Sequence, residues 1–388
     1  MATGTAAGLL EIRSAQSYFK HRLLQHYTEP FSGMVGSTAV DNRVVVLDGY
    51  AGRGRFDNGD PGSAELIMQM AASIKRVRIE PVMIESAKND FEHLEKVARE
   101  YVELGVNVVA RQGKLEQHLD AVLEQAHGVP LFMFLDPTGA GMPFNRLVKI
   151  MNGVRSGLRP PTELLMNFSA ELTRRQGGQV VQPGGMLGNY PTMDAVCGGP
   201  WWRQIVREAV EPGPRPSFEV AAKRVAHAYA ERLGAATGMM PVVVPVYRKV
   251  GRQPIYHLVF LTRSDYGLWV MADAIAKAQQ DWLRATVPDR GDGLFAPAAL
   301  IDEQIHRQQA GAKSVIEANL RRLLDQHRAF RLLPRTREVF DGVYGVATEK
   351  TIAAAVRTLV EFGEIEVPNS GERVRKWALQ RSRTGQAG

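Results

Sequence analysis

A glycine-rich segment that begins with an aspartate follows a short β-branched run. The segment Asp48–Gly54 reads DGYAGRG and comes directly after Val44–Leu47. Glycine has no Cβ atom and adopts positive φ readily, so a ligand could approach the backbone closely where this strand turns into the next helix. The Asp48 carboxylate suits an ammonium group, such as that of a methionine moiety. The segment is not followed by the basic and hydroxyl residues that bind phosphates, which disfavours a loop that binds the phosphates of a nucleotide. An ordinary glycine turn is the alternative.

Two further carboxylates are expected at strand ends. Glu85 closes the run Val82–Glu85, where it could accept hydrogen bonds from the two hydroxyls of a ribose. It lies 37 residues after Asp48, where about 20 are usual, and an inserted loop at Arg55–Gly62 accounts for the difference. A solvated glutamate is the alternative. Asp136 ends the apolar run Leu131–Asp136.

Asp136 and Pro137 are the predicted catalytic residues. The strand that Asp136 ends would neighbour the strand of Asp48, so its carboxyl end would face the group being modified. Asp136 could accept a hydrogen bond from an exocyclic amine, and the Pro137 carbonyl could accept another. A turn-forming Asp-Pro pair is the alternative, but an unpaired acid that ends a buried strand favours function.

Alternating helices and strands must position these residues, which indicates an α/β sheet. The predicted strands are 44–48, 78–85, 106–111, 131–136 and 163–168, followed by a hairpin of 242–249 and 255–262. Their apolar runs suit strands that crossover helices bury on both faces. This is the strand count and order of a seven-stranded Rossmann-like sheet in class I S-adenosylmethionine (SAM)-dependent methyltransferases. Residues 176–200, rich in glycine and proline, predict a loop at the active site.

The end of the chain has a different pattern. A short helix from Thr336, a turn, a helix over Glu349–Phe362 with Thr348 as N-cap, and a charged hairpin are typical of a winged helix. We therefore predict a methyltransferase-like α/β domain with an N-terminal helix over 1–265, a helical connector over 266–330 and a winged-helix-like domain over 331–388.

Positive charge is concentrated near the C-terminus. The net charge is +7 overall and +5 from Arg321 to Gly388, with 13 basic and 8 acidic residues there. Such a region often contacts a polyanion, although many solvated surfaces are basic. The candidate phosphate contacts are Arg357 on the predicted recognition helix and Arg373, Arg375 and Lys376 on the hairpin. Winged helices also dock proteins, which remains the alternative.

Composition narrows the protein class. With 45% hydrophobic residues in 388, the chain can bury a large core, which excludes disorder. The single cysteine, Cys197, excludes an internal disulfide and a zinc site built on several thiolates. No apolar run approaches the roughly 18 residues of a membrane span, and no secretory signal is apparent. We expect a cytoplasmic, cofactor-using protein with no metal site and no membrane contact.

Together these motifs resemble the three-Cys-motif partner proteins (TcmP). The resemblance covers roughly residues 15–280. It is carried by Lys20, Asp48–Gly54, Gly59–Ser63 (GDPGS), Glu85, Asp136–Gly139, Asn167-Phe168, Tyr256–Phe260 and Thr262. That family is SAM-methyltransferase-like and is associated with a radical-SAM-type partner that carries a cysteine motif and is encoded beside it. The resemblance thus implies SAM as cofactor and such a protein as partner.

The expected site combines the motifs with this resemblance. The SAM-binding residues would be Asp48, Gly49, Tyr50, Gly52, Gly54, Glu85, Gly113 and Lys114. Substrate-binding residues would be Lys20, Thr138, Asn167, Arg174 and Arg175, of which the two arginines could hold an anion after the fifth strand or simply be solvated.

Two departures from methyltransferase patterns bear on the substrate. Where an aspartate commonly reads the adenine amine, the sequence has Gln112–Glu116, and Lys114 cannot accept a hydrogen bond. Adenine recognition must then use the backbone or Glu116, or the affinity for SAM is reduced. Thr138-Gly139 stands where amino-methyltransferases of adenine or cytosine often have a proline and an aromatic ring, so a flipped base would lose a stacking partner.

The favoured hypothesis is a SAM-dependent methyltransferase acting on nucleic acid or a modified nucleotide. The alternative is a catalytically degenerate SAM-fold adaptor that docks a partner protein or nucleic acid. A nuclease ranks low because the sequence shows no cluster of carboxylates for metal ions.

Overall fold

The computed structural model describes residues 15–137, 139, 141–181, 190–210, 217–247, 253–285 and 297–382. The chain divides into two compact units. The sheet unit comprises residues up to His21 together with Thr28–Arg263, and the C-terminal unit comprises Arg22–Tyr27 together with the chain from Ser264 onward. Helix α2 (Ala15–Val35) contributes residues to both.

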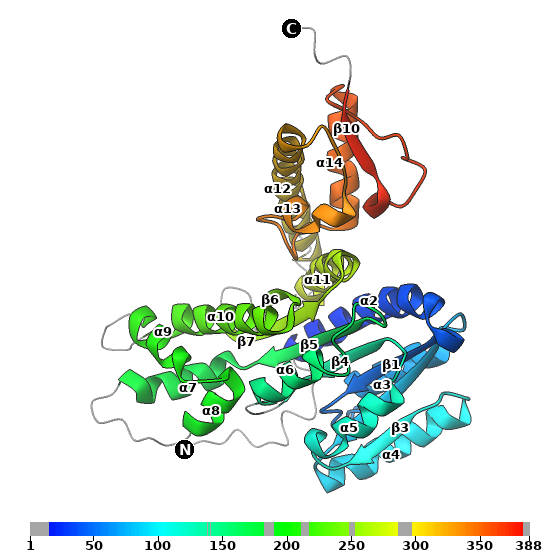
Figure 1. Ribbon diagram of the computed structural model, residues 1–388, viewed down its shortest axis with the longest axis vertical. Helices are drawn as coiled ribbons and strands as arrows, with labels where there is room; N and C mark the ends of the chain where they lie inside the picture. The colour runs from blue at the N-terminus through cyan, green and yellow to red at the C-terminus, as the bar shows by residue number, and fades with distance from the viewer. Residues whose placement is uncertain are drawn as a thin grey trace. The chain divides into compact units, whose positions relative to one another are not determined.

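The sheet unit is built on seven strands in the order β3-β2-β1-β4-β5-β7-β6 (Figure 1). They are β1 (Arg43–Asp48), β2 (Arg78–Glu85), β3 (Val109–Gln112), β4 (Leu131–Leu135), β5 (Thr162–Phe168), β6 (Met240–Tyr247) and β7 (Pro254–Thr262). The strands β1 to β5 pair in parallel, whereas β7 pairs antiparallel with both β5 and β6. This is the predicted class I methyltransferase-like α/β fold. The sequence prediction of its sheet is confirmed.

Helices cover both faces of this sheet because its strands are apolar on both sides. They are α3 (Ser63–Ser73), α4 (Lys88–Glu103), α5 (Leu115–Gln125), α6 (Phe144–Asn152), α7 (Ala170–Val181), α8 (Tyr190–Cys197), α9 (Trp201–Ala209) and α10 (Glu219–Thr237). On one face, Val45 and Leu47 of β1 share a core with Leu119 of α5 and Tyr229 of α10. On the other, Phe31 of α2 contacts Phe132 of β4.

The predicted loop over residues 176–200 is wrong in its described part. Helix α7 continues to Val181 and α8 begins at Tyr190, while 182–189 lie outside the described residues. A Cβ at Gly177 would lie 3.1 Å from Phe218 and 3.2 Å from Val206. This glycine therefore serves close packing between helices, which offsets its low helix propensity.

The third strand also begins later than predicted. Val108 donates its N–H to the carbonyl of Val106 at 3.0 Å, which makes a tight turn ahead of β3. The hairpin of β6 and β7 is present as predicted, with its connection at 248–252 outside the described residues.

The carboxyl ends of the parallel strands meet at one edge of the sheet. Asp48 and Glu85 are the last residues of β1 and β2, Asp136 directly follows β4, and Asn167 is the penultimate residue of β5. Ligands of open α/β sheets bind outside this edge, so the predicted site residues gather where a ligand would be expected.

The C-terminal unit combines long helices with a small antiparallel sheet. Its elements are α11 (Asp265–Ala285), α12 (Pro297–Gln326), β8 (Ala329–Arg331), the 3₁₀ turn η3 (Leu333–Arg335), α13 (Thr336–Val339), α14 (Glu349–Glu361), β9 (Ile365–Glu366), the 3₁₀ turn η4 (Val374–Lys376) and β10 (Ala378–Arg381). The sheet order is β8-β10-β9. Strand β8 was not predicted from the sequence. One apolar core holds Trp269, Leu320, Phe340 and Val356 together.

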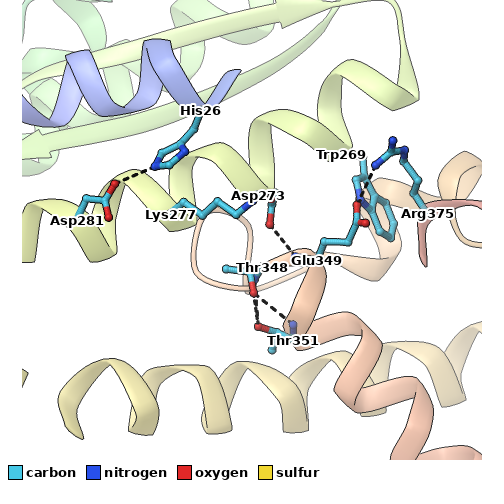
Figure 2. Close-up of polar contacts among 9 residues, drawn as sticks. All are labelled: His26, Trp269, Asp273, Lys277, Asp281, Thr348, Glu349, Thr351 and Arg375. Atoms are coloured by element: carbon cyan, nitrogen blue, oxygen red, sulfur yellow. Dashed lines mark hydrogen bonds and ion pairs between the residues drawn. The ribbon is translucent and has the colours of Figure 1, made fainter. Parts of the chain in front are cut away.

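The start of α14 is fixed by side chains from α11 and from its own cap (Figure 2). Thr348 accepts a hydrogen bond from the Thr351 N–H at 3.3 Å, so its predicted N-cap role is confirmed. Asp273 of α11 accepts a hydrogen bond from the Glu349 N–H at 2.8 Å, and the Glu349 carboxylate accepts another from the Trp269 indole at 2.7 Å. The bonds to Thr348 and Asp273 satisfy backbone N–H groups that a helix start leaves unpaired, and the indole bond holds the Glu349 side chain.

Candidate cofactor and acceptor site

The turn Gly49–Gly54 directly after β1, which we call the glycine corner, has unfilled space beside one of its glycines. Gly52 and Gly54 have φ of +58° and +78°, a region that favours glycine. A Cβ at Gly52 would find no heavy atom within 4 Å, whereas one at Gly49 would lie 2.7 Å from Leu135. Gly49 thus allows the strand end to pack, and Gly52 leaves space beside the backbone.

Asp48 is buried beneath this corner. Its carboxylate accepts hydrogen bonds from the Tyr50 N–H at 3.1 Å and from the Ser63 hydroxyl at 2.6 Å, which joins the loop to the start of α3. Burial raises the pKa of Asp48 to about 7, against the lowering effect of those two bonds. The nearby charges of Asp136 and Lys20 also act on it, in opposite directions. The corner and the end of β4 therefore share one electrostatic environment.

Glu85 lies beside the open corner at the end of β2. One carboxylate oxygen accepts the Gly52 N–H at 2.9 Å, and the other accepts the Ala87 N–H at 2.7 Å. Glu85 is partly exposed. The Ser86 hydroxyl also donates to the oxygen that Ala87 contacts, at 3.4 Å, whereas the oxygen bonded to Gly52 can accept a second hydrogen bond. The group is therefore held in place and still has capacity for a ligand's hydroxyl.

The end of β3 closes the corner on its other side. The Gly113 N–H donates to the Glu85 carbonyl at 2.9 Å. Lys114 is exposed, and its own N–H donates to the Gln117 side chain at 2.8 Å. Burial, and then the charge of Glu116, raise the pKa of the Tyr50 hydroxyl to about 12. The only acidic side chain in the stretch 112–116 is thus near Tyr50, at the place where the sequence lacked an adenine-reading aspartate.

A second polar group forms around Asp136. Its carboxylate pairs with the Lys20 ammonium and accepts a hydrogen bond from the Asn167 amide at 3.0 Å. The Lys20 nitrogen lies 5.2 Å from the centre of the Tyr256 ring, a cation–π distance. Four elements, α2, β4, β5 and β7, therefore meet here. Among the described residues, none pairs with the buried Asn167 Oδ1.

The other residues predicted to face the substrate differ in burial and in their partners. Pro137 is buried, and Thr138 lies outside the described residues. Arg174 donates to the Pro254 carbonyl at 2.8 Å, while Arg175 is exposed. The roles assigned to these residues stay predictions.

The basic residues of the C-terminal unit also differ from one another. Arg357, Arg373 and Lys376 are exposed. Arg375 instead pairs with Glu349 at 3.2 Å (Figure 2) and lies 4.9 Å from the centre of the Tyr266 ring. Its side chain is 13% exposed, so its contacts are internal to the unit.

Two contacts of the site were not predicted from the sequence: the Tyr256 ring beside Lys20, and the Ser63 hydroxyl that donates to Asp48. Both contacts join residues far apart in the chain, so no local sequence pattern predicts them.

Within the described ranges, no helix has both the length and the hydrophobicity to cross a bilayer. In the same ranges, no three histidine, cysteine, aspartate or glutamate side chains lie close enough together to hold a metal ion.

The sequence matches no protein-family model and no curated protein. Among solved structures, the chain is similar to the small RNA methyltransferase HEN1, with 10% identity and a TM-score of 0.33; the match covers 63% of this chain and 25% of that one, about a quarter of its length. It is similar to the methyltransferase domain of bacterial-CtHen1-CN, with 11% identity, a TM-score of 0.31 and coverage of 62% and 99%. A third is an uncharacterized protein from Listeria monocytogenes serotype 4b, with 9% identity, a TM-score of 0.27 and coverage of 84% and 98%. The assignment of the fold class rests on the strand order of the seven-stranded sheet and not on these comparisons, whose TM-scores are low.

Proposed function

We propose that the protein is a SAM-dependent methyltransferase that acts on nucleic acid or on a modified nucleotide. The observation that carries the proposal is the open corner at Gly52, where a positive φ, free space at the Cβ position and the Glu85 carboxylate come together. A side chain at residue 52 would fill the space in which a cofactor could lie against the backbone.

The residues around the corner fit the parts of SAM. Bound SAM supplies a methyl group on a positively charged sulfur. Glu85 would accept a hydrogen bond from one ribose hydroxyl through the oxygen that contacts Gly52, which retains a lone pair, and from the other hydroxyl in place of Ser86. Asp48 would balance the ammonium group, because a nearby cation favours the charged form of a carboxylate. The backbone of Gly113 and Lys114 and the ring of Tyr50 would flank the adenine.

The Asp136 group would hold the methyl acceptor. Its carboxylate already pairs with Lys20 and Asn167, and each oxygen can accept one more hydrogen bond, for example from an amine. Through these positions Asp136 would orient the acceptor. Catalysis would then rest mainly on positioning.

The C-terminal unit would supply the contact to nucleic acid or to a partner. We propose that residues 331–388 form a winged-helix-like domain in which Arg357, Arg373 and Lys376 meet phosphates. The TcmP-like motifs further support a radical-SAM-type protein with a cysteine motif as partner.

A catalytically degenerate adaptor is the second candidate. It is favoured by one observation: the exposed Lys114 stands where a carboxylate would read the adenine amine.

Tritiated SAM distinguishes the two candidates. We would incubate the full chain with tritiated SAM and total nucleic acid, with and without the partner. Label in nucleic acid that an Asp136→Asn variant fails to incorporate supports the methyltransferase. Stable copurification with the partner and no transfer to RNA or DNA under either condition would favour the adaptor.

A further inference from the structure

Lys20 and Asp136 place opposite charges side by side at the carboxyl edge of the sheet. The Lys20 ammonium pairs with one oxygen of the Asp136 carboxylate, and the other oxygen accepts the Asn167 amide at 3.0 Å. The Lys20 side chain is 13% exposed and the Asp136 side chain 18%. The Lys20–Asp136 pair is therefore shielded from most of the solvent, and a ligand can still reach it.

Neighbouring side chains hold this pair in place. The Lys20 nitrogen lies 5.2 Å from the centre of the Tyr256 ring, and Tyr256 is only 6% exposed. The Asn167 amide donates to Asp136 although no described residue pairs with its own buried Oδ1. The two charges are thus fixed by contacts from α2, β5, β7 and the end of β4, and a pre-organised site spends little entropy on binding.

The pair lies beside the glycine corner. In the parallel pairing of β1 with β4, Asp48 is level with Phe134, two residues before Asp136. Strands rise about 3.3 Å per residue and lie about 4.8 Å apart, so the backbones at Asp48 and Asp136 are roughly 8 Å from each other. A group that binds the pair would therefore lie next to a cofactor in the corner.

The hydrogen-bonding capacity of the pair defines its ligand. An ammonium group has three N–H donors and no acceptor, whereas a carboxylate only accepts. Among the described residues, Lys20 donates to Asp136 alone, and each oxygen of Asp136 accepts one hydrogen bond. Lys20 thus keeps donors and Asp136 keeps lone pairs. A ligand that contacts both must offer an acceptor and a donor at adjacent positions.

Charged ligand groups do not meet this requirement. A phosphate only accepts hydrogen bonds, so it would suit Lys20 and be repelled by Asp136. A protonated amine only donates, so it would suit Asp136 and be repelled by Lys20. A nucleoside carries two neutral groups of the required kind. One is a base edge on which an N–H stands beside an acceptor, and the other is the ribose 2′-hydroxyl, which both donates and accepts.

We infer that the Lys20–Asp136 pair binds a neutral nucleoside group that donates and accepts hydrogen bonds at adjacent positions, and that this group belongs to the methyl acceptor. The second half of the inference rests on the proposed function. The methylated atom then belongs to a base or to a sugar hydroxyl, and not to a phosphate or a protonated amine. Both residues are needed for this selectivity, because either charge alone would select an ion of the opposite sign.

Nucleoside binding to the full chain tests the pair without SAM. We would measure the affinities of the four ribonucleosides and their 2′-deoxy forms by ligand-observed NMR. Wild type should bind at least one ribonucleoside with Kd below ~10 mM, and Lys20→Met should bind it at least about tenfold more weakly. Lys20→Arg, which keeps a charged donor, should retain most of the affinity. The matched control Lys96→Met removes an exposed charge from α4 and should stay within about twofold of wild type.

Inorganic phosphate tests the charge balance of the pair. Asp136→Asn removes the negative charge at nearly constant shape and leaves Lys20 without its counter-charge. We expect this variant to bind phosphate at least about tenfold more tightly than wild type does, a gain that partial unfolding would not produce. Equal affinity for the ribose and deoxyribose forms would assign the base edge to the pair, and a loss in the deoxy form would assign the 2′-hydroxyl; both support the inference.

Three outcomes would overturn it: no nucleoside binding by wild type up to ~10 mM, equal affinities of Lys20→Met and Lys96→Met, or no gain of phosphate binding in Asp136→Asn. The proposed function fails separately. Nucleoside binding that depends on Lys20, without methyl transfer to any nucleic acid, would leave the pair as a nucleoside site and remove the methyltransferase. Methyl transfer by Lys20→Met at the wild-type rate would overturn the inference and leave the proposed function.

Discussion

Replacing Asp48 by asparagine should make the protein more stable at alkaline pH. The carboxylate is fully buried, and burial raises its pKa from 3.8 to about 7. Asparagine has nearly the same shape, can accept from the Tyr50 N–H and can donate to the Ser63 hydroxyl, so the two hydrogen bonds of this position have substitutes. The substitution removes the ionisation and keeps the packing.

The size of the effect follows from the shift in the pKa of Asp48. Because the folded state holds the proton more tightly than the unfolded chain, the free energy of unfolding is highest below pH 4 and falls as the pH rises through 7. A shift of roughly three units corresponds to about 4 kcal/mol. Asp48→Asn should therefore be more stable than wild type by about 4 kcal/mol at pH 8 and by less than half of that at pH 5.

Urea denaturation at pH 5 and pH 8 measures this difference. Asp120→Asn is the matched control, because the Asp120 side chain is 85% exposed and its loss should change stability by no more than about 1 kcal/mol at either pH. If Asp48→Asn is less stable than wild type at pH 8, or if the difference between them does not change with pH, then ionisation of Asp48 does not destabilise the folded protein.

Three further predictions concern other parts of the molecule. Lys20→Met should lower the free energy of unfolding by about 2 kcal/mol by leaving Asp136 short of a partner, with substantial recovery in Lys20→Arg; equal stability of all three proteins would contradict the ion pair. Thr348→Ala should cost about 1 kcal/mol in urea denaturation, and Thr348→Ser much less, because only alanine lacks a capping oxygen; equal losses would exclude the cap. Arg373→Gln with Lys376→Gln should weaken binding of a random-sequence RNA and reduce its salt dependence by about two phosphate contacts; unchanged salt dependence would assign these side chains to solvent.

The strands of the sheet were predictable because each one is a local pattern. Each of the first five apolar runs has strand length and is separated from the next by a helix, so the parallel pairing and the carboxylates at the strand ends follow from the sequence, whereas the order of the strands came from the match to the class I methyltransferase sheet. Asp48, Glu85 and Asp136 are accordingly at one edge of the sheet.

The contacts between those residues were not predictable in the same way. Lys20 and Asp136 are 116 residues apart, and only the packing of α2 beside β4 and β7 brings them together. Likewise, glycines in α7 suggested a loop, because nothing in the local sequence shows that Phe218 and Val206 need the space at Gly177. Arg375 was expected at a nucleic-acid surface, yet Glu349 and Tyr266 hold it.

SAM binding to the full chain, measured by calorimetry, tests the central claim most directly. Gly52→Leu would place a side chain in the open corner, and Gly59→Leu is its matched control, since Gly59 also has positive φ and free space but lies in the inserted loop. We predict that wild type and Gly59→Leu bind one SAM per chain and that Gly52→Leu binds at least about tenfold more weakly. Failure of wild type to bind SAM, or equal affinity of the two variants, would contradict the account.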